Sequence, residues 1–179
     1  GETWSLDALV KEVLKDEDYY EAFGGGVTVS GGEPLSRYRF VAQFFRRLQE
    51  LDIHTALDTC GLAPTAALVS VLPYTDHVLF DIKLLDPDLH ERYTGHSNSL
   101  VLQNLSAVAD TIRQDRQRSQ DGDHTRRLWI RTPLIPEATA TSENIIAISH
   151  YIAEHLADVV DRWELCAFNN ACRQKYDKL

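Results

Sequence analysis

The sequence predicts an α/β fold in which parallel strands are covered by outer helices. Segments with apolar residues at every third or fourth position alternate with short β-branched or apolar runs along the 179 residues. Strict alternation of helix and strand is typical of a parallel sheet, either open or closed into a barrel. No linker and no internal repeat interrupts the pattern, so we expect a single domain over residues 1–179.

The boundaries of the elements follow from the same patterns. Helices are predicted over Ser5–Tyr20, Tyr38–Leu51, Pro64–Leu72, Asp86–Tyr93, Ser99–Gln117 and Ser142–Leu156. Strands are predicted over Val27–Val29, Ile53–Leu57, His77–Ile82, Leu128–Leu134 and Arg162–Phe168. Ser5 and Ser142 are the candidate caps of the first and last helix. The chain starts on a helix, so a first strand is expected upstream of Gly1.

Charge and apolar content argue against several classes of protein. The formal net charge of −9 argues against a broad nucleic-acid interface, which needs clustered Lys and Arg. No apolar run approaches the roughly 20 residues that span a bilayer, and no signal peptide is visible, so we expect a cytoplasmic protein with no membrane partner. Cys60, Cys166 and Cys172 form no paired motif, and we predict small buried side chains rather than disulfides.

Polar residues cluster at the same edge of four successive predicted strands. Three groups, Ser30–Pro34, Asp58–Gly61 and Asp81–Lys83, lie at strand ends, and Arg131 lies within the strand Leu128–Leu134. Any one of them is equally well explained as a turn or a helix cap. The carboxyl ends of parallel strands meet at one edge of a sheet, so the four together favour a shared ligand pocket.

The residue types in this pocket indicate the chemistry of its ligand. Gly31-Gly32 lets the backbone approach a ligand closely, and Glu33 can accept hydrogen bonds from an ammonium group. Lys83 and Arg131 can face a carboxylate, while Asp58-Thr59 can hold hydroxyls or a hard cation. An amino-acid-like zwitterion that carries a nucleoside would satisfy all of these groups.

Longer runs around these residues resemble one known family. GGGVTVSGGEPL from Gly24, LDIHTALDTCG from Leu51 and VLFDIKLLDPDLHERYTGHSN from Val78 are similar to the glycyl-radical-enzyme activating enzymes, the pyruvate formate-lyase activating enzyme family of radical S-adenosylmethionine (SAM) enzymes. The TG-x-x-N element at Thr94–Asn98, QNL at Gln103–Leu105 and IRTPLIP at Ile130–Pro136 continue the resemblance in the same order, so that it covers nearly the whole chain.

The resemblance implies a fold and a set of cofactor-binding residues. The fold would be a partial (β/α)6 radical SAM barrel that lacks its first strand and its cluster loop. The residues that match SAM-binding motifs of the family are Gly31, Gly32 and Glu33 for the amino group, Asp58 and Thr59 near the carboxylate and a monovalent cation, Asp81 and Lys83 along the same site, and Arg131 on a later strand.

The resemblance also implies the reaction of the whole protein. Members of the family cleave SAM reductively at a 4Fe–4S cluster, and the resulting 5′-deoxyadenosyl radical takes a hydrogen from a glycine of a partner glycyl-radical enzyme. Flavodoxin or ferredoxin would supply the electron, and a monomer is expected. The cluster motif C-x3-C-x2-C does not occur in this sequence and lies upstream in the family, so we expect this chain alone to be inactive, without a catalytic residue of its own.

Departures from the family leave other interpretations open. FGGG at Phe23–Gly26 replaces the usual SGGG, and the carboxyl-terminal WELCAFNNACRQKY departs from the family pattern, which leaves the partner enzyme undetermined. One alternative is a SAM- or nucleotide-binding module without radical chemistry. Another is a radical SAM enzyme that acts on a small molecule. A purely structural protein is the least expected, because polar strand ends serve no packing purpose.

Overall fold

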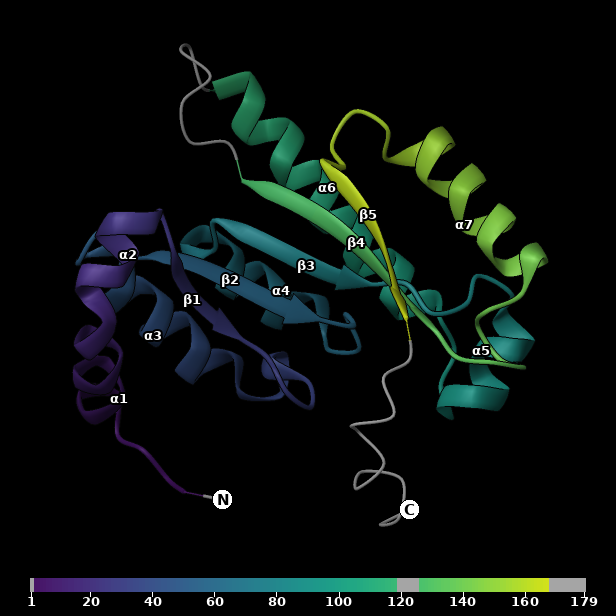
Figure 1. The fold of residues 1–179 in the computed structure, drawn as a ribbon. Coiled ribbons are helices and arrows are strands. Elements are labelled where there is room, and N and C mark those ends of the chain that lie inside the picture. The colour runs from purple at the N-terminus through teal and green to yellow at the C-terminus, as the bar shows by residue number, and fades with distance from the viewer. Residues whose placement is uncertain (1, 119–125, 168–179) are drawn as a thin grey trace.

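The computed structural model describes residues 2–118 and 126–167, which form one parallel sheet with helices packed against it. The sheet has five strands in sequence order: β1 (Gly26–Val29), β2 (His54–Thr59), β3 (His77–Asp81), β4 (Arg127–Leu134) and β5 (Arg162–Ala167). Figure 1 shows the strands in front of α3 (Tyr38–Gln49), α4 (Thr65–Val71) and α6 (Ser99–Arg118). The predicted α/β fold of parallel strands with outer helices is confirmed.

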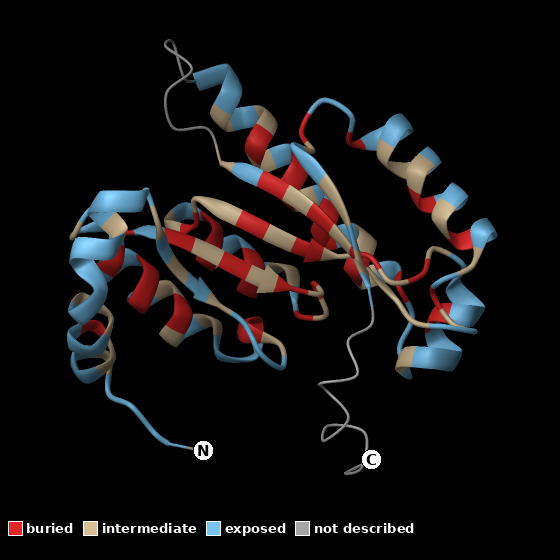
Figure 2. Ribbon diagram, viewed as in Figure 1, coloured by how far each residue is buried: buried red, intermediate tan, exposed pale blue. Residues whose placement is uncertain are grey.

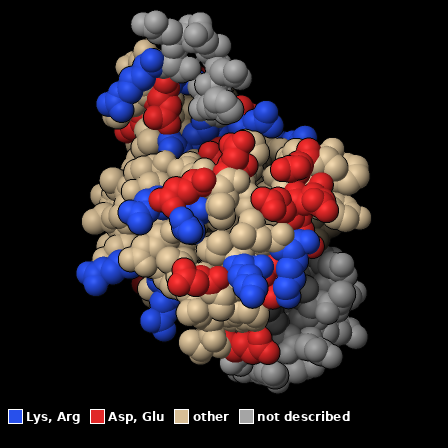
Figure 3. Space-filling view, turned by 90° about the vertical axis from the view of Figure 1, so that its left-hand side faces the viewer, with Lys and Arg blue, Asp and Glu red and all other residues tan. Residues whose placement is uncertain are grey.

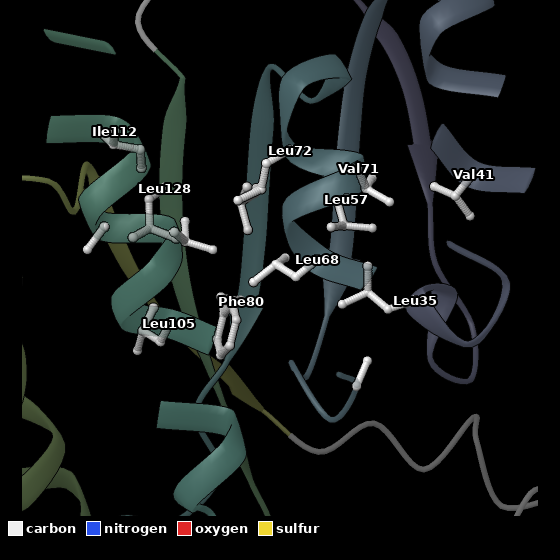
Figure 4. Close-up of a cluster of buried hydrophobic side chains, with 14 of the residues drawn as sticks. Leu35, Val41, Leu57, Leu68, Val71, Leu72, Phe80, Leu105, Ile112 and Leu128 are labelled. Carbon is white, nitrogen blue, oxygen red and sulfur yellow. The ribbon is translucent and has the colours of Figure 1, made fainter. Parts of the chain in front are cut away.

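The core lies between the sheet and these helices. Val41, Phe44, Phe45 and Leu48 form a buried stripe at helical spacing on α3. Alternate strand residues complete the core, as the alternation of red and tan along β2, β3 and β4 in Figure 2 shows. Figure 4 shows side chains of the sheet meeting those of α4 and α6 in one cluster. Each fully buried aliphatic or aromatic side chain of this kind contributes about 1.5–3 kcal/mol.

The other face of the sheet carries the polar side chains. Successive residues of a strand point to opposite faces, so the residues between the buried ones face away from α3, α4 and α6. On β3, Val78 and Phe80 are fully buried, whereas His77, Leu79 and Asp81 are half-buried. Asp58 and Arg131 alternate with buried neighbours on β2 and β4 in the same way. The side chains of Asp58, Asp81 and Arg131 therefore lie on this inner face.

The predicted helix Ser5–Tyr20 is wrong in its extent. The chain forms α1 (Leu6–Val13), a 3-10 turn at Leu14–Asp16 and α2 (Glu17–Phe23), which ends at Gly24 with φ +63°. The acidic pair Glu17-Asp18 favours a new helix amino terminus at this point, because negative side chains stabilise the first turn of a helix. Ser5 caps α1 as predicted, since its Oγ accepts a hydrogen bond from the Ala8 amide at 3.3 Å.

The cap of α7 (Ser142–His155) also differs from the prediction. The capping residue is Thr141 rather than Ser142, and its Oγ1 accepts a hydrogen bond from the Asn144 amide at 3.2 Å. Thr141 has an extended backbone that lets its side chain fold back over the first turn, whereas Ser142 already belongs to the helix. The predicted helix at Pro64–Leu72 forms as α4, with Pro64 preceding it, and continues into a 3-10 turn at Leu72–Tyr74.

The remaining elements follow the sequence closely. The predicted helices Asp86–Tyr93 and Ser99–Gln117 form as α5 (Pro87–Thr94) and α6. The predicted strand end at Phe168, as well as Cys172, lies outside the described residues. Within residues 2–118 and 126–167, no helix is long and apolar enough to cross a membrane.

Charged side chains on the outer surface are mixed in sign. Figure 3 shows Lys and Arg interspersed with Asp and Glu over one side of the molecule. Some are neighbours on a helix, such as Arg47 and Glu50, whose Nη1 and Oε2 atoms lie 2.8 Å apart. Exposed pairs of this kind contribute only about 0–1 kcal/mol each, so they neither hold the fold together nor mark a site.

The start of β1 gives a test of the sheet. A Cβ atom added to Gly26 would lie 2.2 Å from the backbone oxygen of His54, the residue that pairs with it on β2. We expect Gly26→Ala to lower the free energy of unfolding by about 1–3 kcal/mol, because β1 must shift away from β2. Urea unfolding measures this loss.

Gly25→Ala is the matched control. An added Cβ there meets its nearest neighbour, the Tyr20 ring, at an ordinary 3.5 Å. If both substitutions had equal effects, the close approach of β1 to β2 at Gly26 would be wrong.

Candidate functional site

The segments predicted to form a pocket all lie at the carboxyl edge of the sheet. Gly31–Glu33 directly follows β1, Asp58 is near the end of β2, Asp81 ends β3, and Arg131 lies on β4 in register with Asp81. Arg131 Nη1 and Asp58 Oδ2 are 2.8 Å apart, although the two residues are 73 positions apart in the chain. The structure therefore brings the predicted site residues of β2, β3 and β4 together.

Two ion pairs occupy the centre of this edge. Besides Arg131 and Asp58, Lys83 Nζ lies 3.6 Å from Asp81 Oδ2, and all four side chains are half-buried. Lys83 and Arg131 were expected to face the carboxylate of a ligand, but in the structure each is partnered by an aspartate of the chain. Alternating charges thus balance one another, and each positive group is held in place by an aspartate of the chain.

Burial and these charges shift the pKa of two groups. Burial raises the pKa of the Asp81 carboxyl, and the nearby charge of Asp58 adds to the effect, while Lys83 and Arg131 oppose it. Burial lowers the pKa of the Arg131 guanidinium, but the Cys166 side chain, together with the hydrogen bond to Asp58 and its negative charge, outweighs burial and holds that pKa above its usual value. Arg131 therefore remains a cation, and Asp81 is protonated more easily than an ordinary aspartate.

Glu33 ties the loop after β1 to the end of β2. Its Oε1 accepts hydrogen bonds from the Leu35 amide at 3.0 Å and the Thr59 hydroxyl at 2.7 Å. Its Oε2 accepts from the Cys60 amide at 3.0 Å and the Cys60 thiol at 3.2 Å. Both carboxylate oxygens are thus used within the chain. The expectation that Glu33 receives an ammonium group stays a prediction, whereas its structural role is plain.

Gly31 and Gly32 keep the backbone of the same loop open. They adopt φ angles of +87° and +59°, which other residues rarely adopt, and a Cβ added to either would meet nothing within 4 Å. The conformation, not lack of space, demands glycine here. The peptide groups of this loop are exposed and accessible to a ligand.

Asp58 and Thr59 do not act as a pair of side chains. As neighbours on β2 they point to opposite faces of the sheet. Asp58 turns to the inner face and Arg131, whereas the buried Thr59 hydroxyl donates to Glu33 and accepts from the Gly61 amide at 2.9 Å. The proposed monovalent cation at Asp58-Thr59 stays a prediction, to which the structure offers the Asp58 carboxylate.

The thiols differ from the prediction that cysteines are small buried side chains. Cys60 and Cys166 are free and only half-buried. Both belong to strand ends at the carboxyl edge, where Cys60 contacts Glu33 and Cys166 on β5 pairs with Pro133 of β4. Packing is less complete here than in the core, because the edge opens to solvent. Burial still raises the pKa of the Cys60 thiol, and the hydrogen bond to Glu33 acts in the same direction.

Buried amides that sequence reasoning missed support the loop after β3. Asn98 Nδ2 donates to the Leu85 backbone oxygen at 2.7 Å, and Asn144 Nδ2 donates to that of Lys83 at 2.9 Å. Asn98 ends the TG-x-x-N element, which the resemblance singled out without a role. The sequence signal that could have revealed this role was the position of Asn98 in a motif downstream of β3, the strand that carries Asp81.

A large cavity lies elsewhere. It has a volume of about 1010 Å³ and opens at the amino edge of the sheet, where its lining includes Gly26, His54, His77 and Arg126. None of the predicted site residues lines it. The carboxyl edge, with its open loop and paired charges, remains the candidate site, in keeping with the general rule for parallel α/β folds.

Comparison with known proteins places the chain in a family. The model of the Radical SAM superfamily matches residues 4–115, a segment that contains β1, β2 and β3 and the loops that follow them. This chain belongs to the radical SAM superfamily.

Its relatives are activating enzymes. The chain is 35% identical over 179 residues to the (2S)-3-sulfopropanediol dehydratase activating enzyme of Klebsiella oxytoca, covering 100% of this chain and 52% of that protein. It is 31% identical over 186 residues to the pyruvate formate-lyase-activating enzyme of Staphylococcus epidermidis, covering 98% and 66%. The chain thus spans about half to two thirds of the length of these relatives. The predicted resemblance to the glycyl-radical-enzyme activating enzymes is confirmed.

A solved structure agrees with this relationship. A domain of the pyruvate-formate lyase-activating enzyme from Bacteroides vulgatus superposes with a TM-score of 0.65 at 27% identity, covering 86% of this chain and 91% of that one. The five-stranded parallel sheet is consistent with a partial radical SAM barrel.

The radical SAM superfamily uses SAM and a 4Fe–4S cluster, and the described residues fit the two differently. Donors and acceptors at the carboxyl edge suit a zwitterion: an open backbone at Gly31-Gly32, a carboxylate at Asp58 and cations at Lys83 and Arg131. A cluster needs several cysteine thiolates. Within residues 2–118 and 126–167, no group of three or more His, Cys, Asp or Glu side chains is placed to hold a metal ion. The described residues therefore fit SAM and do not fit the cluster.

Replacement of Glu33 tests its structural role. A glutamine side chain has one carbonyl oxygen, so in Glu33→Gln an NH₂ group must face donors that the carboxylate now accepts. We expect the free energy of unfolding to fall by about 1–3 kcal/mol. Urea unfolding measures the change, and Glu154→Gln on the exposed side of α7 serves as the control, with an effect within about 0.5 kcal/mol. Equal stability of Glu33→Gln and wild type would contradict the structural role of the hydrogen bonds that join Glu33 to Thr59 and Cys60.

The raised pKa of Asp81 predicts a pH dependence. Because the folded state binds the Asp81 proton more tightly than the unfolded state does, wild-type stability falls as pH rises from the ordinary aspartate pKa through the raised one. Asp81→Asn removes this titration. We expect wild type to lose stability relative to Asp81→Asn over that pH window, measured by thermal unfolding between about pH 3.5 and 7. A relative gain of wild-type stability with rising pH would show that Lys83 and Arg131 outweigh burial.

Proposed function

We propose that the whole protein is an activating enzyme that generates a glycyl radical on a partner glycyl-radical enzyme. Two observations support this. The strand-end segments converge on one edge of the sheet, where Asp58 and Arg131 meet at 2.8 Å, and similarity to activating enzymes extends over the full chain. In this proposal a 4Fe–4S cluster, held by cysteines outside the described residues, would supply the electron for cleavage of SAM to methionine and the 5′-deoxyadenosyl radical.

The residues of this chain would bind and orient SAM. The open Gly31-Gly32 backbone and the Asp58 carboxylate suit the ammonium group. Arg131 contacts Asp58 through Nη1, and a guanidinium has five N–H donors, so donors remain for the carboxylate of the ligand. Lys83 likewise has three donors and one paired aspartate. Pairing with Asp58 and Asp81 thus orients both cations without using up their capacity to bind.

The partners of the whole protein belong to the same proposal. The protein substrate would be a glycyl-radical enzyme, as the names of the relatives suggest. A flavodoxin or ferredoxin would donate the electron to a monomeric enzyme in the cytoplasm. This chain alone would be inactive, because its described residues fit the ligand and not the cluster.

The experiment uses the full-length protein after anaerobic reconstitution. We expect about four irons per chain, or a multiple of four, and 5′-deoxyadenosine formation that depends on dithionite. Asp58→Asn should raise the Kd for SAM about 10- to 100-fold, the range that corresponds to loss of one hydrogen bond to a charged group. The control Asp110→Asn changes a surface carboxylate on α6 and should leave the Kd unchanged.

Three outcomes separate the interpretations. Iron uptake with SAM cleavage supports the proposal, and formation of a glycyl radical on an added partner enzyme completes it. SAM binding without iron uptake or cleavage would favour the alternative of a SAM-binding module. If the protein neither takes up iron nor binds SAM, the proposal is wrong.

A further inference from the structure

Asn104, in the QNL element, is a fully buried polar residue that lies outside the proposed SAM-binding residues. It lies on α6 in a stripe with Val101, Leu105 and Val108, which are buried apolar residues at helical spacing. An amide in such a stripe costs free energy unless it is hydrogen-bonded, so its contacts account for its place there.

Those contacts lead to the loop after β2. Asn104 Nδ2 donates to the backbone oxygens of Gly61 and Ala63, each at 2.7 Å. Both neighbours are acceptors, so the NH₂ group must face them and the orientation of the amide is fixed. Its Oδ1 is buried without a hydrogen-bond partner among the described residues. The Asn104 side chain therefore makes both of its hydrogen bonds to the loop through Nδ2, while its Oδ1 makes none among the described residues.

The same loop is fixed at two other points. Glu33 binds the Thr59 hydroxyl and the Cys60 amide and thiol from the opposite side. Gly61 has φ +69°, and a Cβ added there would lie 2.3 Å from the Phe80 ring, so the chain turns closely over the core. Glu33, Phe80 and Asn104 thus all contact the segment of residues 59–63.

We propose that Asn104 is a positioning residue for SAM, acting through the Gly61–Ala63 turn. This inference rests on the proposed function. Glu33 follows Gly31-Gly32 in the chain and binds Thr59 and Cys60, which follow Asp58. A ligand that contacts both the Gly31-Gly32 backbone and Asp58 would therefore lie beside the segment of residues 59–63. Asn104 holds that segment from the helix side, and its loss would leave the turn to Glu33 and to the packing of Gly61 on Phe80. Binding would then have to order the turn, which weakens affinity.

The test measures SAM affinity and stability separately in the full-length protein. We expect Asn104→Ala to raise the Kd for SAM, measured by equilibrium dialysis well below the Tm, about tenfold, while the iron content stays the same. Asn104→Asp keeps the shape but places an oxygen against two carbonyl oxygens, and we expect a larger rise. Asn104→Ser is a milder variant that retains a donor, and we expect a smaller rise; it serves if the others do not fold.

Thr75→Val is the matched control. Thr75 is buried, and its hydroxyl donates to the Val71 backbone oxygen at 3.0 Å, near the amino edge of the sheet. We expect Thr75→Val to lower the Tm, as the Asn104 variants do, but to leave the Kd for SAM unchanged. Amide hydrogen exchange should show faster exchange at Cys60 and Gly61 in the Asn104 variants and not in Thr75→Val.

The outcomes distinguish this inference from the proposed function. If Asn104 variants lower the Tm but bind SAM within about twofold of wild type, Asn104 is merely structural and the inference is overturned. Unchanged exchange at Cys60 and Gly61 would overturn it as well. If the wild-type protein does not bind SAM, the proposed function fails, and the positioning role toward SAM fails with it, whatever the exchange rates show.

Discussion

Parallel pairing places the carboxyl ends of the five strands at one edge of the sheet, and the other features of the site depend on this geometry. Asp81 and Arg131 are register partners on adjacent strands, and Arg131 is in turn paired with Glu164 on β5. The alternation of faces then sends apolar residues to the helices and charged ones to the inner face. One regular arrangement of the backbone thus produces both the core and the site.

Charges at this edge are tolerated because they come in neighbouring pairs. A half-buried aspartate would be costly by itself, as the raised pKa of Asp81 shows. Lys83 and Arg131 compensate part of that cost, and the aspartates in turn hold the two cations in defined positions. A charged ligand therefore meets groups that are already oriented, which lowers the reorganisation that binding requires.

The loops at this edge are held by side chains rather than by regular backbone pairing. Glu33, Asn98, Asn104 and Asn144 each bind backbone groups of a strand-end loop. All four therefore act at the place where β-sheet hydrogen bonding ends and backbone groups need other partners. The match to the radical SAM superfamily includes this edge, since the family model spans the first three strands and the loops that follow them.

The sequence by itself determined the elements and the candidate site residues. Helical and alternating periods are local properties, so the five strands and most helices could be predicted to within a few residues, and runs such as VSGGEP and DTCG marked the strand ends. Local patterns failed where two competing signals met, as at the break between α1 and α2 and at the Thr141 cap.

Only the tertiary structure decided what each site residue contacts. Thr59 appeared to be a partner of Asp58 but donates to Glu33. Arg131 is paired with Asp58, and Asn104 donates to the backbone oxygen of Gly61. These contacts join residues 26, 73 and 43 positions apart. No periodicity records such distances, because the partner of a polar side chain is fixed by which strands pair and which face each residue occupies.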